Sequence, residues 1–298
     1  MSPTRPARLA RPARRSKPTL APRPTRTSPR PRAIRLPPPE PAGLAHAHLA
    51  PLVSDGAVPS LAWAVVRDGD KAVGGFGGAG PETSFQIGSV TKVFTALVLA
   101  DMAERGEVHL SDPAARYLPG RVTVGPTLAD LATHTSGLPR LPRGLLPSAL
   151  LHPGDPYARY PAGGLVRDAR RALRAAPPAG SAQRPYVYSN FGFGLLGYLL
   201  GQAAGTPYET LVTTRICAPL GLPGTAFTPP APPWTAQGHR RGRPVRDWRL
   251  SAMAGAGGLY STAADLARFL YACLLAVLAA PGTPAAPDTA LEALGPAI

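Results

Sequence analysis

Apolar positions along the chain predict a β-hairpin early in the sequence. The continuous apolar run at residues 61–66 is typical of a strand, and the glycine-rich stretch 71–76 predicts its partner. Between them, Arg67-Asp68-Gly69-Asp70 has the composition of a tight turn. Because two strands alone are only marginally stable, we expect this hairpin to need more strands or a covering layer.

Helical spacing of apolar residues predicts most of the remaining elements. The expected helices cover residues 42–55, 89–104, 191–204 and 206–216, and a last one opens at 261–265. Ser261 or Thr262 can cap the free amides of that last helix, and Asp265 suits its positive end. Residues 110–180 are rich in Pro, Gly and Arg and predict short helices at best. The apolar run 266–280 contains Arg268 and is too short to span a bilayer, so we expect a buried helix and no transmembrane segment.

The net charge of +15 belongs mainly to the start of the chain. Residues 1–36 hold eleven Arg and Lys and no acidic residue. We expect residues 1–41 to be a disordered Pro/Arg-rich tail, whose binding to nucleic acid or an anionic surface would be unspecific. Nucleic acid is therefore not the expected partner. No apolar segment of a signal peptide is visible, so the location stays open: cytoplasmic by default, extracytoplasmic if the true start lies elsewhere.

The two cysteines do not suggest metal or redox chemistry. Cys217 and Cys273 lie in apolar helical surroundings and are expected as buried free thiols, with a single disulfide as the alternative. No Cys/His cluster has the spacing of metal ligands, and we expect no metal and no cofactor.

A serine stands three positions before a lysine at the start of the predicted helix 89–104. Ser89 and Lys92 share one helical face, which places a hydroxyl beside an amine. Such an amine can take the proton of the serine while the serine attacks a carbonyl. The helix dipole favours negative charge on the serine oxygen, and partial desolvation would lower the pKa of the amine. The alternative is a capping serine with a solvated lysine, because about one Ser-x-x-Lys match is expected by chance in a chain this long.

Tyr188 and Asn190 form a second candidate constellation, just before the predicted helix 191–204. A tyrosine oxygen can relay the proton of a serine to a leaving group, and an asparagine can orient a lysine and an amide of the substrate. The alternative is a loop in which Asn190 only caps the following helix.

Five segments in order, covering roughly residues 43–270, resemble the serine beta-lactamase-related family. The resemblance is to class C beta-lactamases, D-alanyl-D-alanine carboxypeptidases and related esterases. The segments are Ser89-Val90-Thr91-Lys92, Leu131-Ala132-Thr133-His134-Thr135-Ser136-Gly137-Leu138-Pro139, Tyr188-Ser189-Asn190, Ala218-Pro219-Leu220-Gly221-Leu222 and Gly255-Ala256-Gly257-Gly258-Leu259-Tyr260-Ser261-Thr262.

This resemblance implies an α/β (α+β) fold over residues 42–298, with an antiparallel sheet flanked by helices and a mostly helical subdomain. It implies that Ser89 is the acylated nucleophile, Lys92 its general base, Tyr188 the proton shuttle and Asn190 the ligand of the substrate amide. His134 is interpreted as a structural residue of its loop and not as a member of a triad. The implied substrate is a small molecule or peptide with an amide, lactam or ester bond.

The family has a third catalytic motif besides Ser-x-x-Lys and Tyr-x-Asn, which is Lys-Thr-Gly or His-Thr-Gly on a late strand. This motif has no counterpart here. Lys92 is the last lysine and His239 the last histidine of the chain. In the family, that strand contributes a backbone N–H to the oxyanion hole, and loss of one such donor costs about 3–4 kcal/mol in transition-state stabilisation. We therefore expect a domain that is incomplete at its C-terminus, with an unpaired edge and an uncovered apolar face at the Trp63 strand.

Three functional hypotheses remain at this point. The first is a serine hydrolase that acts through an acyl-enzyme, with the activity of this form open. The second is a non-catalytic relative that keeps the pocket and acts as a binding protein. The third is an anion-binding protein whose basic tail carries the function.

Overall fold

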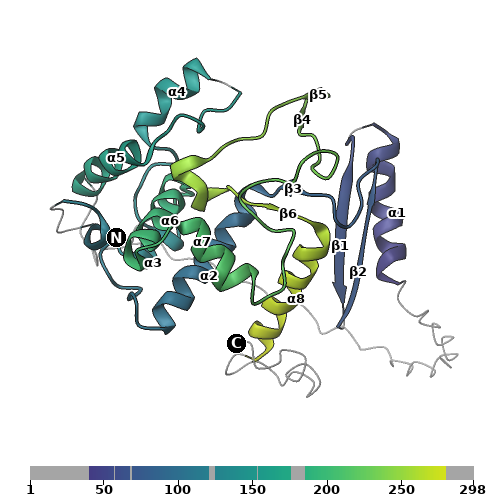
Figure 1. Ribbon diagram of the computed structural model, residues 1–298, viewed down its shortest axis with the longest axis horizontal. Coiled ribbons are helices and arrows are strands. Elements are labelled where there is room, and N and C mark those ends of the chain that lie inside the picture. Colours follow the sequence, from purple (N-terminus) through teal and green to yellow (C-terminus); the bar gives the residue numbers. More distant parts are fainter. Residues whose placement is uncertain are drawn as a thin grey trace, which may run out of the picture. The chain divides into compact units, whose positions relative to one another are not determined.

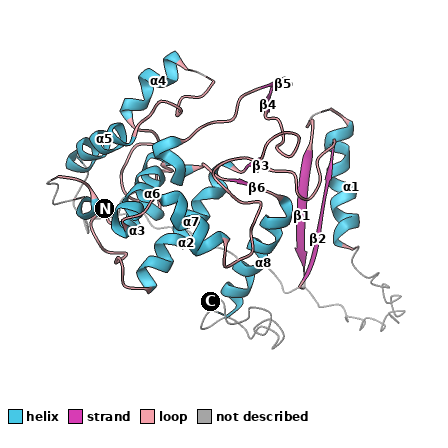
Figure 2. Ribbon diagram, viewed as in Figure 1, coloured by secondary structure: helices cyan, strands magenta, loops and turns pink. Residues whose placement is uncertain are grey.

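The computed structural model describes residues 40–56, 58–67, 69–120, 125–152, 154–175 and 185–279, all within the compact unit Pro39–Ile298. The predicted tail, except its last two residues, therefore lies outside the described residues, as do Asp68 of the expected turn and residue 280 of the expected last helix. The described part combines several helices with short antiparallel sheets (Figures 1 and 2).

The predicted hairpin is present, and helices cover it. Strands β1 (Leu61–Arg67) and β2 (Asp70–Phe76) pair antiparallel from Leu61↔Phe76 to Arg67↔Asp70. Helices α1 (Pro41–Ser54) and α8 (Ala263–Ala279) both pack against the hairpin, which lies between them in Figure 1. The expectation of an uncovered apolar face is therefore wrong. The expected unpaired edge is observed within the described residues, where β1 pairs with β2 alone.

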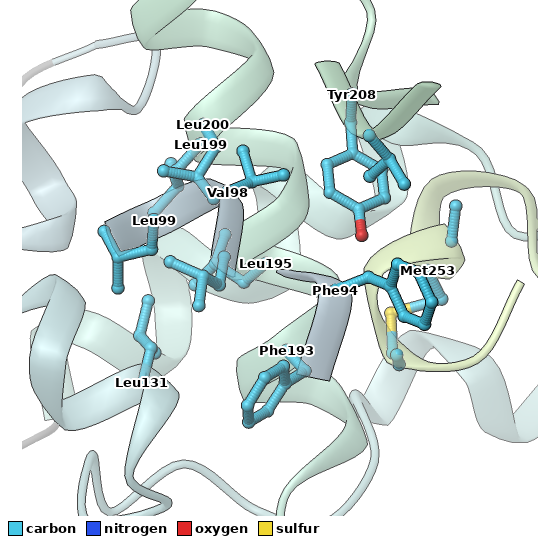
Figure 3. Packing of buried hydrophobic residues seen from close by; sticks show 14 of the residues in the cluster. Phe94, Val98, Leu99, Leu131, Phe193, Leu195, Leu199, Leu200, Tyr208 and Met253 are labelled. Atoms are coloured by element: carbon cyan, nitrogen blue, oxygen red, sulfur yellow. The ribbon is translucent and has the colours of Figure 1, made fainter. Parts of the chain in front are cut away.

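The helical part of the fold is built around α2 (Thr91–Glu104) and α6 (Asn190–Ala204). Figure 3 shows their apolar side chains meeting in one cluster with those of neighbouring segments. Phe94 of α2 also stacks on Phe269 of α8, with ring centroids 4.1 Å apart, so this core continues to the helix that covers the hairpin. The members of the cluster that Figure 3 labels are Phe94, Val98, Leu99, Leu131, Phe193, Leu195, Leu199, Leu200, Tyr208 and Met253.

The region 110–180 contains one helix longer than the sequence suggested. It holds the short elements η2 (Ala114–Tyr117), α3 (Leu128–Ala132), η3 (Arg143–Leu145) and α4 (Leu146–Leu151), as expected. However, α5 spans 14 residues, Ala162–Ala175. Its buried residues Leu165, Ala169 and Leu173 recur at every fourth position, a helical pattern that the surrounding glycines and arginines obscured.

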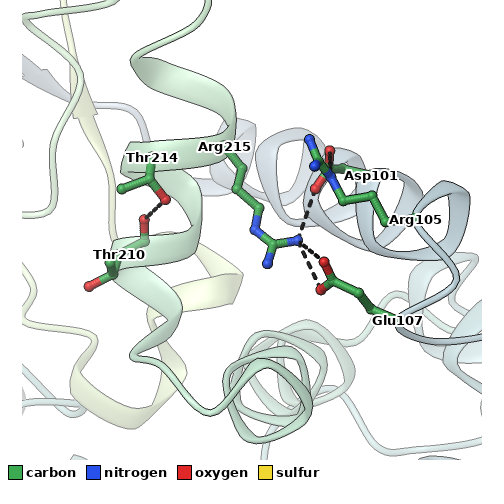
Figure 4. A network of polar contacts seen from close by, with 6 residues as sticks. All are labelled: Asp101, Arg105, Glu107, Thr210, Thr214 and Arg215. Carbon is green, nitrogen blue, oxygen red and sulfur yellow. Dashed lines mark hydrogen bonds and ion pairs between the residues drawn. The ribbon is translucent and has the colours of Figure 1, made fainter.

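The helix α7 (Tyr208–Val212) continues into a wider turn, η4 (Thr213–Cys217), within the predicted helix 206–216. An ion-pair network fixes this turn to the end of α2, because Arg215 contacts Asp101 at 3.1 Å and Glu107 at 2.9 Å (Figure 4). Cys217 is a buried free thiol, and Cys273 is a partly buried one.

Short strands join distant parts of the chain around the start of α2. Strand β3 (Phe85–Gln86) pairs antiparallel with β6 (Tyr260–Ser261), and β4 (His239–Arg240) pairs with β5 (Arg243–Pro244). Thr262, rather than Ser261, caps α8, since its hydroxyl accepts the amide of Asp265 at 3.1 Å. The pairing of β3 with β6 brings the segment before Ser89 next to the segment before α8, and this positions the site.

In the ranges that the structure describes, no helix combines the length and apolar character that crossing a membrane requires. Across the same ranges, no three His, Cys, Asp or Glu side chains gather as a metal ion would need.

Candidate active site

Ser89 lies in a tight turn, η1 (Gly88–Val90), immediately before α2. Gly88 has φ +51°, a left-handed conformation that glycine adopts without strain. The amide of Ile87 donates to the carbonyl of Leu259 at 3.0 Å, which attaches the turn to the later segment. As a result, the side chain of Ser89 is exposed at the start of a buried helix.

Lys92 is buried, and its ammonium nitrogen has two acceptors. Its side chain is only 6% exposed. Its Nζ donates to Ser89 Oγ at 3.0 Å and to the carbonyl of Ala256 at 2.6 Å. The amine therefore lies against the serine hydroxyl, as the spacing of three residues predicts, and a backbone carbonyl from the far end of the chain holds it there.

The carbonyl of Ala256 belongs to η5 (Ser251–Ala256), which two threonines of α2 fix in place. Thr95 Oγ1 donates to the carbonyl of Gly255 at 2.8 Å, and Thr91 Oγ1 accepts the amide of Leu259 at 3.2 Å. Both threonines are fully buried. One face of α2 thus binds the backbone of residues 255–259 on both sides of Lys92.

Tyr188 reaches the same serine from the loop before α6. Its hydroxyl donates to Ser89 Oγ at 2.7 Å. The ammonium nitrogen of Lys92 lies 5.0 Å from the centroid of the Tyr188 ring. Ser89 Oγ is therefore the common acceptor of Lys92 and Tyr188, which are far apart in sequence.

His134 holds the Tyr188 loop. Its carbonyl accepts the amide of Val187 at 2.9 Å, and its Nδ1 accepts the amide of Ser189 at 3.1 Å. Its ring lies 4.6 Å from the Tyr188 ring. Burial, together with the charge of Lys92, lowers the pKa of His134 below its ordinary value of 6.5, which keeps Nδ1 free to accept. These contacts agree with a structural role.

The surroundings shift the pKa values of Lys92 and Tyr188 downward. Burial is the largest cause for Lys92, and the nearby charge of Arg140 adds to it, so that its pKa falls below the ordinary 10.5 although Tyr188 opposes the shift. Burial raises the pKa of Tyr188, but its hydrogen bonds with Lys92 and Ser89 and the charges of Lys92 and Arg140 outweigh this, and the net shift is downward from 10.0. Both groups thus lose their protons more readily than in water.

Asn190 lies at the start of α6 but does not contact the lysine. Its side chain hydrogen-bonds the hydroxyl of Tyr157. Its Oδ1 is buried and has no hydrogen-bond partner within the described residues. The expected contact between Asn190 and Lys92 is not present among the hydrogen bonds of the described part. The neighbouring Ser189, whose Oγ accepts the amide of Gly192 at 2.8 Å, caps the helix instead.

Three groups near Lys92 and Tyr188 were not identified from the sequence: the carbonyl of Ala256, the Tyr157 hydroxyl and the guanidinium of Arg140. The carbon of this guanidinium lies 5.4 Å from the centroid of the Tyr188 ring. Arg140 directly follows the segment Leu131–Pro139, which contributes to the family resemblance, and this position was the one signal in the sequence that could have pointed to it. The sequence gives no such signal for the Ala256 carbonyl. Every residue has a carbonyl, and only the fold determines which one lies beside Lys92.

A hollow of about 1210 Å³ adjoins the site, and its lining does not include Ser89, Lys92 or Tyr188. Trp248 lines it and connects it to the site, since the carbonyl of Trp248 accepts from Gln86 at 2.6 Å and its ring lies 5.4 Å from Tyr157. The hollow therefore offers space for parts of a ligand beyond the reacting atoms.

Comparisons with known proteins find relatives of this chain named as carboxypeptidases and beta-lactamases. The chain is 34% identical over 198 residues to the D-alanyl-D-alanine-carboxypeptidase/endopeptidase AmpH of Escherichia coli (strain K12), which covers 62% of this chain and 47% of that protein. It is 31% identical over 242 residues to a beta-lactamase of the same organism, which covers 76% of this chain and 59% of the relative. The chain thus spans about half to three-fifths of the length of these curated relatives.

Solved structures and a family model lead to the same group. The D-alanine carboxypeptidase AmpC from Burkholderia cenocepacia matches with a TM-score of 0.60 and 30% identity, covering 85% of this chain and 68% of that one. The octameric penicillin-binding protein homologue from Pyrococcus abyssi matches with a TM-score of 0.64 and 27% identity, covering 77% and 55%. The family model "Beta-lactamase" matches residues 45–296. With its α/β fold and this match over most of its length, the chain belongs to the beta-lactamase family.

Proposed function

We propose that this protein is a serine hydrolase that cleaves an amide, lactam or ester bond of a small molecule or peptide through an acyl-enzyme on Ser89. The observation that carries the proposal is the convergence of Lys92 Nζ and the Tyr188 hydroxyl on Ser89 Oγ, at 3.0 and 2.7 Å. Membership of the family and relatives named beta-lactamase and D-alanyl-D-alanine-carboxypeptidase support it.

Acylation follows from this arrangement. Ser89 Oγ attacks the carbonyl carbon of the substrate while the neutral amine of Lys92 takes the hydroxyl proton. Tyr188 then donates its hydroxyl proton to the departing nitrogen or oxygen, and the ammonium of Lys92 returns the proton to the phenolate. The lowered pKa values of Lys92 and Tyr188 suit these transfers.

Deacylation uses the same groups in the reverse direction. Tyr188 passes its hydroxyl proton to the neutral amine of Lys92 and takes a proton from a water molecule that attacks the ester carbonyl of the acyl-enzyme. The bond between Ser89 Oγ and the acyl carbon then breaks, and the ammonium of Lys92 gives its extra proton to the serine oxygen. Asn190 is proposed to bind the amide of the substrate, which its unpartnered Oδ1 supports.

Covalent labelling tests this proposal. We expect an uncharged fluorophosphonate or a labelled penicillin to add its mass to Ser89 of the wild-type protein. Ser89→Ala should abolish the addition, and Tyr188→Phe should slow it. Ser54→Ala is the matched control, because Ser54 is an exposed serine on α1 whose hydroxyl donates to the carbonyl of Pro51. Folded wild-type protein that stays unlabelled by both probes would favour the non-catalytic binding protein instead.

A further inference from the structure

His134 binds the backbone on both sides of Tyr188. Its carbonyl accepts the amide of Val187 at 2.9 Å, and its imidazole Nδ1 accepts the amide of Ser189 at 3.1 Å. The residue between these two amides is Tyr188, whose hydroxyl donates to Ser89 Oγ at 2.7 Å. The position of the phenol beside the serine therefore depends directly on His134.

The backbone conformation of His134 turns both of its acceptors toward the loop before α6. Its φ is +61°, in the left-handed region, which costs energy for most residues that carry a Cβ. Histidine and asparagine are among the residues that adopt it more often than others. Such a conformation persists where surrounding contacts require it, and the two bonds to the segment 187–189 are contacts of this kind.

Two further bonds hold the same loop, and their acceptors do not titrate. The carbonyl of Pro139 accepts the hydroxyl of Ser189 at 2.7 Å, and the carbonyl of Arg140 accepts the amide of Phe191 at 3.1 Å. Nδ1 of His134 differs from these carbonyls because it can bind a proton. Once protonated, it is a donor and faces the N–H of Ser189, which is also a donor.

Aromatic rings and one lysine surround the imidazole of His134. The rings of Tyr188, Tyr186 and Phe193 lie 4.6, 5.5 and 4.9 Å from it. The titratable groups that face it are therefore the two tyrosines of the loop before α6 and Lys92 of α2. Burial, and after it the charge of Lys92 while that amine is protonated, lowers the pKa of His134 below 6.5. A histidine that has lost the loop returns toward its ordinary pKa, so a fall in pH favours release of the loop.

We infer that His134 is a positioning residue whose neutral imidazole holds Tyr188 against Ser89, and that protonation of Nδ1 releases the loop and switches the protein off in acid. The effect on rate rests on the proposed hydrolase function, whereas the release of the loop does not. When a proton from solvent binds Nδ1, the bond to the Ser189 amide breaks and two N–H groups face each other. The phenol then moves away from Ser89 Oγ, where a displacement of about 1 Å is enough to slow a reaction strongly.

A histidine that served only the packing of the core makes a different prediction. Its replacement would change the rate by the same factor at every pH. A histidine that must be neutral adds a second group that has to lose a proton, besides Lys92. Below the midpoints of both groups, log kcat/KM then falls by about two per pH unit instead of about one.

The first test follows kcat/KM for 4-nitrophenyl acetate from about pH 9 down to about pH 4.5. We expect a limiting slope of about 2 in the wild-type protein and about 1 in His134→Asn. The asparagine keeps an acceptor next to Cγ, tolerates a positive φ and does not bind a proton in this range. His109→Asn is the matched control and should keep the wild-type slope, because His109 is an exposed histidine outside the site.

A second variant serves if His134→Asn does not fold. His134→Phe keeps a ring and has neither the acceptor nor the proton, so it should also give a slope of about 1, with kcat/KM lowered about 10-fold or more at every pH. Circular dichroism checks that each protein stays folded across the range. Equal slopes in the wild-type protein and the folded variant would overturn the inference and leave the proposed function intact.

The last test needs no activity, because it measures hydrogen exchange at the Ser189 amide, corrected for the intrinsic effect of pH on exchange. In the wild-type protein, protection of this amide should fall about 10-fold or more between about pH 7.5 and 4.5, and in His134→Asn it should stay nearly constant. If the wild-type protein hydrolyses no ester, the proposed function fails and this exchange alone decides the role of His134. The same pH dependence of protection in both proteins would overturn the inference.

Discussion

At the scale of single residues, the environment of Lys92 decides how the site can work. A lysine ammonium that is 6% exposed loses most of its hydration, and the two oxygens that it contacts replace only part of it. The guanidinium of Arg140 acts in the same direction. These influences favour the neutral amine, which is the form that can accept the proton of Ser89.

The pH dependence of hydrolysis should show this shift. Because Lys92 must be neutral to act as a base, kcat/KM for a neutral ester should rise with pH and level off below the ordinary lysine pKa of 10.5. The midpoint belongs to Lys92 and Tyr188 together, since their titrations are coupled. Arg140→Gln removes one cause of the lowered pKa and should move the midpoint to higher pH. Initial rates across the pH range check this, and a midpoint at or above 10.5 would contradict it.

The sequence indicated which side chains would lie together at the candidate site, but not which backbone groups would join them. Ser89, Lys92 and Tyr188 were proposed from spacing and from family resemblance, and the structure brings them together. The contact between Asn190 and Lys92 was expected and is not present, because the Asn190 side chain instead bonds Tyr157, a residue that no motif connects to it. The carbonyl of Ala256 could not be foreseen, since every residue has a carbonyl and only the fold selects one.

At the scale of elements, α6 and η5 approach each other through glycines. A Cβ on Gly255 would lie 2.7 Å from the carbonyl oxygen of Phe193 and 3.1 Å from the Cα of Gly197. These neighbours are backbone atoms, so they cannot move aside as the end of a side chain would. The close contact matters for the site because the carbonyl that holds Lys92 belongs to the next residue.

Gly255→Ala should therefore affect stability and reactivity together. We expect the free energy of unfolding to fall by about 1–3 kcal/mol and the labelling of Ser89 to slow. Gly163→Ala is the control, because it also lies in a helix but has nothing within 4 Å of the added Cβ, and it should raise stability by up to about 1 kcal/mol. Denaturant unfolding and the labelling rate measure both effects. Unchanged stability in Gly255→Ala would show that the two segments do not pack this closely.

Elements with a clear apolar period were predicted well, and those defined by distant contacts were not. The hairpin, α2, α6 and α8 follow from their patterns, within a few residues at each end. The sequence also signalled α5 through Leu165, Ala169 and Leu173, but the composition of its surroundings concealed it. The pairing of β3 with β6 involves only two residues in each strand, too few for any pattern.

At the scale of the whole molecule, most of the excess positive charge and the residues of the proposed site lie in different parts of the chain. Eleven of the 32 Lys and Arg residues precede residue 37, whereas the remainder of the chain holds 21 against 17 acidic residues. The proposed site draws its residues only from this nearly balanced remainder.

Removing residues 1–38 should therefore weaken retention on a cation-exchange column and leave the labelling rate of Ser89 unchanged. We expect the shortened protein to leave a cation-exchange column at lower salt, because it has lost eleven positive charges. Its Ser89 should react with a fluorophosphonate at the wild-type rate. Chromatography and a labelling time course measure the two properties. Loss of labelling in folded shortened protein would instead assign the first residues a part in the site.

The hydrogen bond from Lys92 to Ala256 joins residues 164 positions apart. During synthesis, a growing polypeptide that has passed α6 already contains the serine, the lysine and the phenol, yet it lacks the acceptor that steadies the amine. Reactivity should consequently switch on late, once residues 251–259 have left the ribosome and docked on α2. A chain released before that point would carry all three side chains, but its lysine would lack the carbonyl that holds the amine beside Ser89 Oγ.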